Sequence, residues 1–207
     1  MHHPVQVCSL SAELCATMGL VKPSDVKQLL AAQVFISDGE AEKSRELTLS
    51  LLAWSPAPFS RNIFNPGHVT CTGVVLSPDK HHVLLVHHRR LDRWLLPGGH
   101  VEEEDDLAAD TARREVIEET GANLDLSVRP ALVGCDVHAI PARGREPLHL
   151  HHDLIFGFQA VSREFQCSAE SREVVWRSVG RMSDLPGSIR RSVARMLNGR
   201  HTGGGHP

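Results

Sequence analysis

The sequence predicts an α+β fold, in which a domain of mixed strands and helices, residues 66–198, follows a helical N-terminal extension, residues 1–65. Apolar residues in the extension recur at helical spacing. From about His68 onward they alternate with polar residues or form short apolar runs, as in β-strands. An acidic segment with helical periodicity then follows Pro97-Gly98-Gly99 in the middle of the strand-rich part. Together, these three observations indicate helices packed on a sheet.

Two helices account for the extension. The first is expected over residues 25–36, with Ser24 as its N-cap and with one apolar face made of Val26, Leu29, Leu30 and Val34. The second is expected over residues 39–54, and its apolar stripe should contain Leu47, Leu51 and Leu52. Two short helices cannot bury their apolar faces alone. They should therefore pack on the domain that follows or on another subunit, as in a homodimer.

The domain itself should alternate strands with helices. Strands are expected over residues 69–76, 83–88, 94–96, 131–139, 149–161 and 173–178, where apolar and β-branched residues are bounded by turn residues. One helix should span residues 106–120 and end at Gly121. A last helix should span residues 188–197, with Arg190, Arg191 and Arg195 on its solvated side. Residues 199–207 are rich in glycine and histidine and should form a disordered tail.

The composition argues against several classes of protein. A formal net charge of −3 gives no overall attraction to nucleic acid or to an anionic membrane, so neither partner is expected. Residues 5–21 are mildly apolar but contain Glu13 and lack a cationic start, which argues against a signal peptide or a membrane span. The five cysteines are widely spaced without a Cys-x-x-Cys pair, which argues against disulfides or a structural zinc site. A cytoplasmic location is therefore expected.

The chemistry is concentrated in the acidic segment. Glu115, Glu118 and Glu119 stand at positions i, i+3 and i+4, so their carboxylates share one helix face. Like charges at this spacing repel each other, and a bound cation explains their clustering better than chance does. Hard divalent ions such as Mg²⁺ or Mn²⁺ prefer oxygen ligands of this kind. Arg114, four residues before Glu118, can hold a neighbouring carboxylate in one rotamer.

Two glycines stand just before this helix. Gly98 and Gly99 leave the backbone free of side chains, so a carbonyl there can complete a metal shell and backbone groups can approach phosphate. His100 follows them directly and either contacts a substrate phosphate or caps the loop.

The segment that starts at these glycines resembles the Nudix box, G-x5-E-x7-R-E-U-x-E-E-x-G-U, where U is a bulky aliphatic residue. Its second half, residues 114–121, matches the box residue for residue. The acidic position in the middle departs from the box. Counted from Gly99 it falls on Asp105, and counted back from Arg114 it falls on Asp106, because the loop carries one extra residue. Aspartate thus stands where glutamate is usual.

The resemblance implies a Nudix fold, a mixed β-sheet sandwiched between helices (α/β/α). It implies metal-dependent hydrolysis of a phosphoanhydride (pyrophosphate) bond in a nucleoside diphosphate linked to another moiety. The catalytic residues would be Glu118, Glu119 and Arg114, and the ligands of Mg²⁺ (or Mn²⁺) would be Glu115, Glu118, Glu119 and the Gly98 carbonyl. A box glutamate or a distant acid would act as base, and the further acidic candidates are Asp105, Asp106, Glu170 and Glu173.

A nucleotide-type small molecule is the expected substrate, and its binding residues should be Gly99, His100, Arg89, Arg90, His149 and His151. The two arginines either bind phosphate or form a solvated basic turn. His149, His151 and Asp153 alternate along an expected strand and share one sheet face. They are a wall of the substrate cleft, ligands of an extra metal, or a polar network. His68-x-Thr70 and His149-x-His151 also resemble a subgroup of the family that has a helical N-terminal extension.

Two other function classes stay open on the sequence alone. A Nudix-fold nucleotide-binding or regulatory module without turnover would account for the extra loop residue and for the extension. An isomerase acting on a diphosphate ester would need a reactive cysteine near the metal. Cys71 and Cys135 lie on expected strands, where buried and inert thiols are typical. The intact helix glutamates favour the hydrolase.

Overall fold

The computed structural model of the protein describes residues 21–89, 91–169 and 171–199. Arg90, Glu170 and all but the first residue of the expected disordered tail lie outside this part of the chain, as do Cys8, Cys15 and most of the weakly apolar N-terminal stretch. None of the helices within the described residues combines the length and the apolar character needed to cross a membrane.

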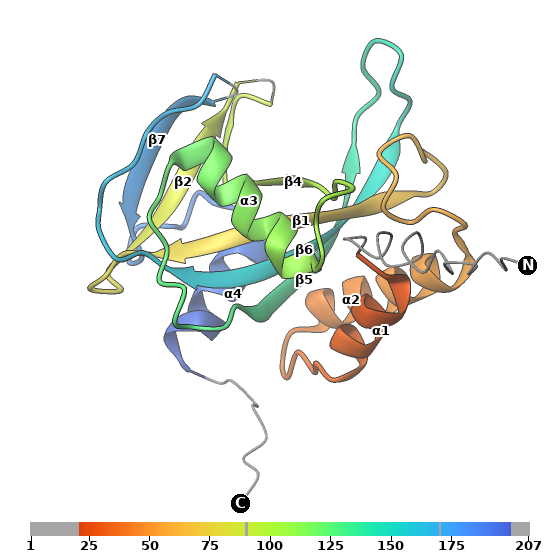
Figure 1. Ribbon diagram of the computed structural model, residues 1–207, viewed down its shortest axis with the longest axis horizontal. Helices are drawn as coiled ribbons and strands as arrows, with labels where there is room; N and C mark the ends of the chain where they lie inside the picture. The colour runs from red at the N-terminus through yellow and green to blue at the C-terminus, as the bar shows by residue number, and fades with distance from the viewer. Residues whose placement is uncertain (1–20, 90, 170, 200–207) are drawn as a thin grey trace, which may run out of the picture.

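One seven-stranded sheet forms the centre of the molecule (Figure 1). Its main path runs β3-β2-β1-β6-β5, with β4 paired to β1 and β7 paired to β2. The pairing of β1 with β6 is parallel and the other strand pairs are antiparallel, so the sheet is mixed. The strands are β1 (Gly67–Leu76), β2 (His82–His88), β3 (Arg93–Leu95), β4 (Gly98–His100), β5 (Ala131–Ile140), β6 (His149–Gln159) and β7 (Ser171–Ser178).

Helices cover both faces of this sheet. The helices are α1 (Pro23–Ala31), α2 (Gly39–Trp54), α3 (Ala108–Thr120) and α4 (Gly187–Leu197). One apolar cluster joins α1, α2 and α3 to residues such as Val69, Val75 and Phe156. A second cluster joins α4 to the opposite face through Val74, Leu76 and their neighbours. The prediction of an α+β fold with a mixed sheet sandwiched between helices is therefore confirmed.

The extension packs on the domain of the same chain. On α2, the Thr48 hydroxyl lies 3.2 Å from Nδ1 of His152, and the Ser44 hydroxyl accepts a hydrogen bond from the Val137 backbone. Asp38, at the N-cap of α2, forms ion pairs with Arg191 and Arg195 of α4. The sequence left open whether the extension packs on the domain that follows or on another subunit. In the described residues it packs on the domain of its own chain.

Several details of the extension and of α4 differ from expectation. The first helix ends at Ala31 rather than near residue 36, and Lys22 rather than Ser24 is its N-cap. Val34 is consequently outside the helix and 63% exposed, and Leu47 is 52% exposed because the buried face of α2 is completed by Ser44 and Thr48 instead. The prediction that Arg191 and Arg195 are merely solvated is wrong, since both reach Asp38.

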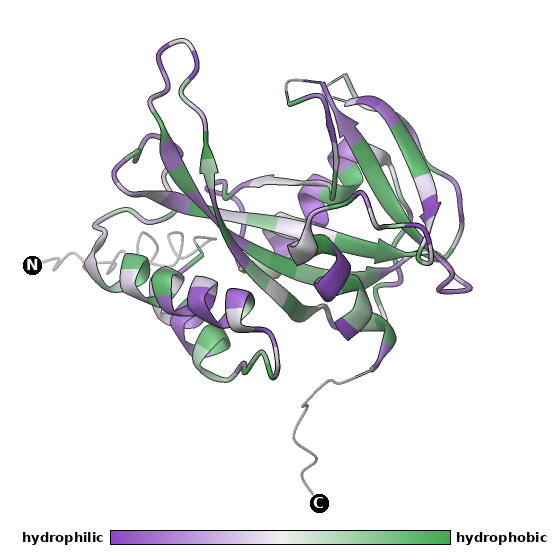
Figure 2. Ribbon diagram, turned by 180° about the vertical axis from the view of Figure 1, so that it is seen from behind, coloured by the Kyte–Doolittle hydropathy of each residue, from purple (hydrophilic) through white to green (hydrophobic). Residues whose placement is uncertain are grey.

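The long β5–β6 hairpin extends beyond the helices (Figure 1). Seen from behind, the strands are hydrophobic where they cross the middle of the molecule and more polar toward the hairpin loop (Figure 2). The predicted strands lie within about two residues of the observed ones. Strand β4 was not predicted, because two glycines and a histidine carry no strand pattern of their own; it forms by pairing with β1.

Candidate functional site

The three predicted carboxylates of α3 differ in their surroundings. Glu119 is only 6% exposed, and its Oε2 accepts a hydrogen bond of 3.1 Å from the Gly98 backbone N–H. Glu115 is half-buried against Gly99, where an added Cβ would stand 2.4 Å from its Oε1. Glu118 is exposed. Two of the carboxylates are thus pressed against β4, and the third faces outward.

Small side chains bring α3 close to the sheet. Thr111, Ala112 and Val116 are completely buried on the face of the helix that meets β1. A Cβ on Gly73 of β1 would lie 2.3 Å from Cγ2 of Val116, so a larger residue there would push the helix away. The left-handed φ of 59° at Gly121 ends the helix directly after its glutamates, as predicted. These residues therefore determine how closely α3 approaches the sheet and where the helix ends.

Arg114 connects the carboxylates to one another. Its Nη1 donates to Glu115 at 3.0 Å and to Glu118 at 3.1 Å. Its Nε and Nη2 donate to the two oxygens of Asp105 at 3.1 and 2.9 Å, and Nη2 also donates to the His100 backbone oxygen at 2.8 Å. Hydrogen bonds to Asp105 and the neighbouring negative charges raise the pKa of Arg114 further above its usual value. The guanidinium therefore orients two metal-ligand candidates and the end of β4 at once.

The two aspartates at the altered box position differ in their surroundings. Asp105 is 4% exposed and also accepts hydrogen bonds from the Glu102 N–H and the Thr111 hydroxyl. Burial alone would raise the pKa of Asp105, but the bonds from Arg114, Glu102 and Thr111 outweigh it and lower the pKa. Asp106 is exposed. Of the two aspartates, Asp105 is thus the one whose carboxylate contacts Arg114.

The donor chemistry of this cluster suits a hard divalent cation. Burial, together with the negative charges of Glu118 and Glu102, raises the pKa of Glu115, although Arg114 partly offsets this. A carboxylate held in such surroundings gains from a further positive charge. Carboxylate oxygens and a carbonyl from a side-chain-free strand are ligands that Mg²⁺ and Mn²⁺ accept. The residues present therefore fit the predicted metal.

A second polar group lies on the opposite face of the sheet, at the starts of β1 and β6. Alternation along β1 places His68, Thr70 and Thr72 on the face of Val74, which packs in the α4 cluster. Two cross-strand rows form this polar face: His138, His151 and His68 in one, and Asp136, Asp153, Thr70 and His100 in the other. Its members come from β1, β4, β5 and β6.

Asp153 anchors the middle of the polar face. It is 8% exposed, and its carboxylate accepts hydrogen bonds from the hydroxyls of Thr70 at 3.1 Å and Thr72 at 2.7 Å. Burial raises the pKa of Asp153, and His138 and the two threonines partly counter this. Burial therefore makes this carboxyl costly to ionise, and the two threonine hydroxyls compensate part of that cost.

The predicted substrate-binding histidines do come together. His100, His149 and His151 lie within one cluster with His68, at ring-centroid distances of about 5 Å. Arg89 is placed elsewhere: its guanidinium donates to the Ser171 backbone oxygen at the start of β7.

Two further acids were weighed as distant candidates. Glu173 is exposed on β7, opposite His87 of β2. Glu170 and Arg90 are outside the described residues.

Two members of the histidine cluster were missed as binding residues. His68 is part of the motif that resembles a subgroup of the family, and His138 is not among the predicted residues. The signal for both is the alternation His68-x-Thr70-x-Thr72 and Asp136-x-His138, which repeats the polar alternation of His149-x-His151-x-Asp153. Only the strand order, with β6 between β1 and β5, turns these three stretches into one surface.

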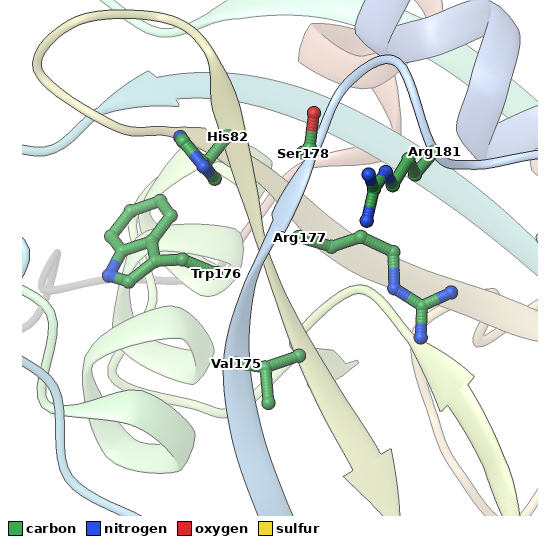
Figure 3. Close-up of a pocket in the computed structure, with 6 residues that line it drawn as sticks. All are labelled: His82, Val175, Trp176, Arg177, Ser178 and Arg181. Atoms are coloured by element: carbon green, nitrogen blue, oxygen red, sulfur yellow. The ribbon is translucent and has the colours of Figure 1, made fainter.

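A surface hollow of about 470 Å³ lies over β2 and β7 (Figure 3). It is lined by His82, Val175, Trp176, Arg177, Ser178 and Arg181. No carboxylate and no predicted site residue lines it, and Arg177 is paired with Asp184. The hollow therefore cannot supply the oxygen ligands that the α3 cluster offers.

The two buried cysteines among the described residues do not offer a reactive thiol near the carboxylates. Cys71 and Cys135 are buried on β1 and β5, and burial raises the pKa of both thiols, that of Cys135 to about 12. A thiol with a raised pKa is a poor nucleophile. The isomerase alternative accordingly gains no support from these two residues.

Comparisons with known proteins agree with the motif. Residues 67–196 match the family model described as NUDIX domain. No curated protein sequence matches the chain.

Similar solved structures include a NUDIX-family hydrolase from Clostridium perfringens, with 21% identity, 63% of this chain and 97% of that chain covered, and a TM-score of 0.46. The match to a MutT NUDIX hydrolase from Burkholderia pseudomallei has 21% identity and a TM-score of 0.47, and it covers 61% of this chain and 95% of that chain. The match to the dihydroneopterin triphosphate pyrophosphohydrolase of E. coli has 21% identity and a TM-score of 0.48, and it covers 63% of this chain and 94% of that chain.

Proposed function

Because this chain belongs to the NUDIX domain family of hydrolases, we propose that it uses Mg²⁺ or Mn²⁺ to hydrolyse a phosphoanhydride (pyrophosphate) bond in a nucleoside diphosphate linked to another moiety. One observation carries the proposal: Arg114 binds Asp105, Glu115 and Glu118 together, while Glu119 and Glu115 face the side-chain-free strand Gly98–Gly99. A surface role would not require a buried Glu119 beside carboxylates that share one guanidinium.

The ligands of the cation would be the carboxylates of Glu115, Glu118 and Glu119 and the carbonyl of Gly98. When bound, the cation neutralises the diphosphate charge and lowers the pKa of the attacking water. Arg114 keeps two of these carboxylates in fixed rotamers, so their positions are set before the substrate arrives. Glu118 is exposed, so its carboxylate is accessible to a cation from solvent.

The substrate would lie across β4. Gly99 lets the Glu115 carboxylate lie directly against the backbone of β4, and His100 extends the polar edge of β4 toward the cluster that contains His149 and His151. Arg89 contributes less than the sequence predicts, because its guanidinium is bound to β7. The cytoplasmic location and the exact substrate stay predictions.

A substrate panel tests the proposal. Nucleoside triphosphates, nucleotide sugars and dinucleoside polyphosphates are incubated with the protein and Mg²⁺ or Mn²⁺, and released phosphate and nucleotides are measured. At least one substrate should be cleaved, and chelation of the cation should stop cleavage. Folded protein that binds nucleotides in calorimetry but forms no product across the panel would instead indicate a binding or regulatory module.

A pair of variants locates the chemistry. Glu119→Gln removes a buried ligand without changing the size of the side chain, so turnover should fall by at least about 100-fold, as metal-site changes commonly do. Glu103→Gln changes an exposed residue of the preceding loop and serves as the control. Circular dichroism confirms that both proteins fold. Full activity in Glu119→Gln would mean that α3 is not the metal site.

A further inference from the structure

The histidine cluster on the polar face is not needed for the proposed carboxylate centre, and its geometry is that of a separate site. Among the described residues, His68, His100 and His151 are the set of three whose ligand nitrogens or oxygens all lie within 4.8 Å of one another. The glutamates of α3 form no such set in that part of the chain; their carboxylates accept hydrogen bonds from the Gly98 backbone and from Arg114. The imidazoles come from three strands, β1, β4 and β6.

Two backbone carbonyls fix the orientation of the rings. Nδ1 of His68 donates to the Ile63 oxygen at 2.9 Å, and Nδ1 of His149 donates to the Pro147 oxygen at 2.8 Å. A carbonyl oxygen only accepts hydrogen bonds, so both Nδ1 atoms carry the proton. In the neutral rings the lone pair is then on Nε2, which points into the cluster. An outer carbonyl partner of this kind is the usual support of a metal-binding histidine.

The nitrogens are already spaced like ligands of one ion. Nε2 of His100 lies 3.1 Å from Nε2 of His68, and Nε2 of His151 lies 3.3 Å from Nε2 of His149. Two nitrogens bound tetrahedrally to zinc at 2.0–2.1 Å are about 3.3–3.4 Å apart. Binding by all three residues requires that their ligand nitrogens, which lie within 4.8 Å of one another, move closer together, and that the proton shifts from Nε2 to Nδ1 in His100 and His151.

The surroundings favour neutral ligands. His68 is 1% exposed, and burial lowers its pKa. Burial and the neighbouring imidazoles lower the pKa of His100 to about 4 and that of His151 to about 2. Several imidazole nitrogens that share one small volume suit a borderline transition-metal ion rather than Mg²⁺.

We propose that His68, His100 and His151 bind one Zn²⁺ through their Nε2 atoms, with His149 beside the fourth coordination position. The ion links the starts of β1 and β6 to the end of β4. His100 is two residues from Gly98, and its carbonyl accepts a hydrogen bond from Arg114. Zinc bound here would therefore also hold β4 in place, and β4 is the strand against which Glu115 and Glu119 pack. It is a second metal site, distinct from the oxygen-ligand site of the hydrolase.

Metal analysis of the full chain, made without an affinity tag, tests this site. Protein stripped with chelator, loaded with Zn²⁺ and desalted should retain one zinc ion per chain by mass spectrometry. His68→Ala and His151→Ala should each lower the zinc affinity by more than about 100-fold, since loss of a ligand exceeds the 10- to 100-fold effect of losing an outer partner. His81→Ala, which removes an exposed histidine of the β1–β2 turn, should match the wild type.

Cobalt provides a readout that needs no variant of the cluster. Co²⁺ bound to the wild-type chain should give the intense visible absorption of a four-coordinate ion, and added Zn²⁺ should remove it. Weak six-coordinate absorption, absence of retained zinc, or equal zinc affinity in His68→Ala and wild type would overturn the proposal. Glu119→Gln should keep the zinc and the cobalt spectrum while losing hydrolysis, so failure of the zinc site and failure of the proposed activity are distinguishable.

Discussion

Arg114 holds Asp105 by two hydrogen bonds, from Nε to Oδ1 at 3.1 Å and from Nη2 to Oδ2 at 2.9 Å. The carboxylate is 4% exposed and nine residues before the guanidinium in the chain. This pair fixes the loop between β4 and α3 in relation to the helix. Of the two aspartates that the box spacing allows, Asp105 is therefore the one beside Arg114.

Asp105→Asn should destabilise the protein, because the amide cannot accept both bonds from Arg114. The expected loss in the free energy of unfolding is about 1.5–3 kcal/mol, typical of hydrogen bonds to charged groups. Asp106→Asn, one residue later and exposed, is the matched control and should change the stability by less than about 0.5 kcal/mol. Urea unfolding measures both. Equal losses would show that the two aspartates share the position.

Gly99→Ala should impair activity through Glu115. The new Cβ would stand 2.4 Å from Oε1 of Glu115, so the carboxylate must move away from β4. A displacement of about 1 Å in a catalytic site can cost roughly 100-fold in rate. Gly39→Ala is the same change where nothing lies within 4 Å of the new atom, and its activity should equal that of the wild type. Matching rates for the two variants would contradict the placement of Glu115.

Glu102→Gln should lower the pKa of Glu115. Burial is the main cause of the raised pKa of Glu115, and the negative charges of Glu118 and Glu102 add to it. Removing the Glu102 charge stabilises the ionised form of Glu115, so its titration in the metal-free protein should move to lower pH, toward the ordinary value of 4.5. Carboxyl-carbon NMR follows the titration. Glu103→Gln should leave it unchanged, and a shift to higher pH in Glu102→Gln would contradict the assignment.

Local patterns predicted the parts of the fold that depend on short stretches of chain. The period of α3, its end at Gly121 and the common face of its glutamates follow from spacing within one helix. The same local reasoning misjudged Leu47, because α2 buries Ser44 and Thr48 against β5 and β6 in its place. Helical spacing identifies a stripe, but the partner surface decides which residues of it are covered.

Long-range pairing determined what the sequence could not show. Spacing alone allowed Asp105 or Asp106, and only the position of Arg114 across the loop separates them. The meeting of His68 with His151 requires that β1 and β6 pair in parallel, although more than eighty residues separate them. The three-residue strand β4 likewise exists through its partner β1.

Asp38→Asn should weaken the attachment of the extension to the domain. The Asp38 carboxylate is 7% exposed, caps α2 through the Ala41 N–H, and pairs with Arg191 and Arg195 of α4. Loss of the charge should cost about 2 kcal/mol in the free energy of unfolding, combining a weaker cap with weaker ion pairs. Burial raises the pKa of Asp38, but the Ala41 bond and the arginines outweigh it, so the folded-state pKa is below the unfolded value near 3.8.

The sign of the pH dependence follows from that depressed pKa. The stabilisation from Asp38 is fully present above the unfolded pKa and is lost as the pH falls through the lower folded pKa. The difference in unfolding free energy between wild type and Asp38→Asn should therefore be constant near neutral pH and shrink below about pH 4. Asp25→Asn, at an exposed position in the first turn of α1, should show a much smaller difference at neutral pH. A difference between wild type and Asp38→Asn that persists unchanged into acid would mean that the carboxylate charge does not hold the extension in place.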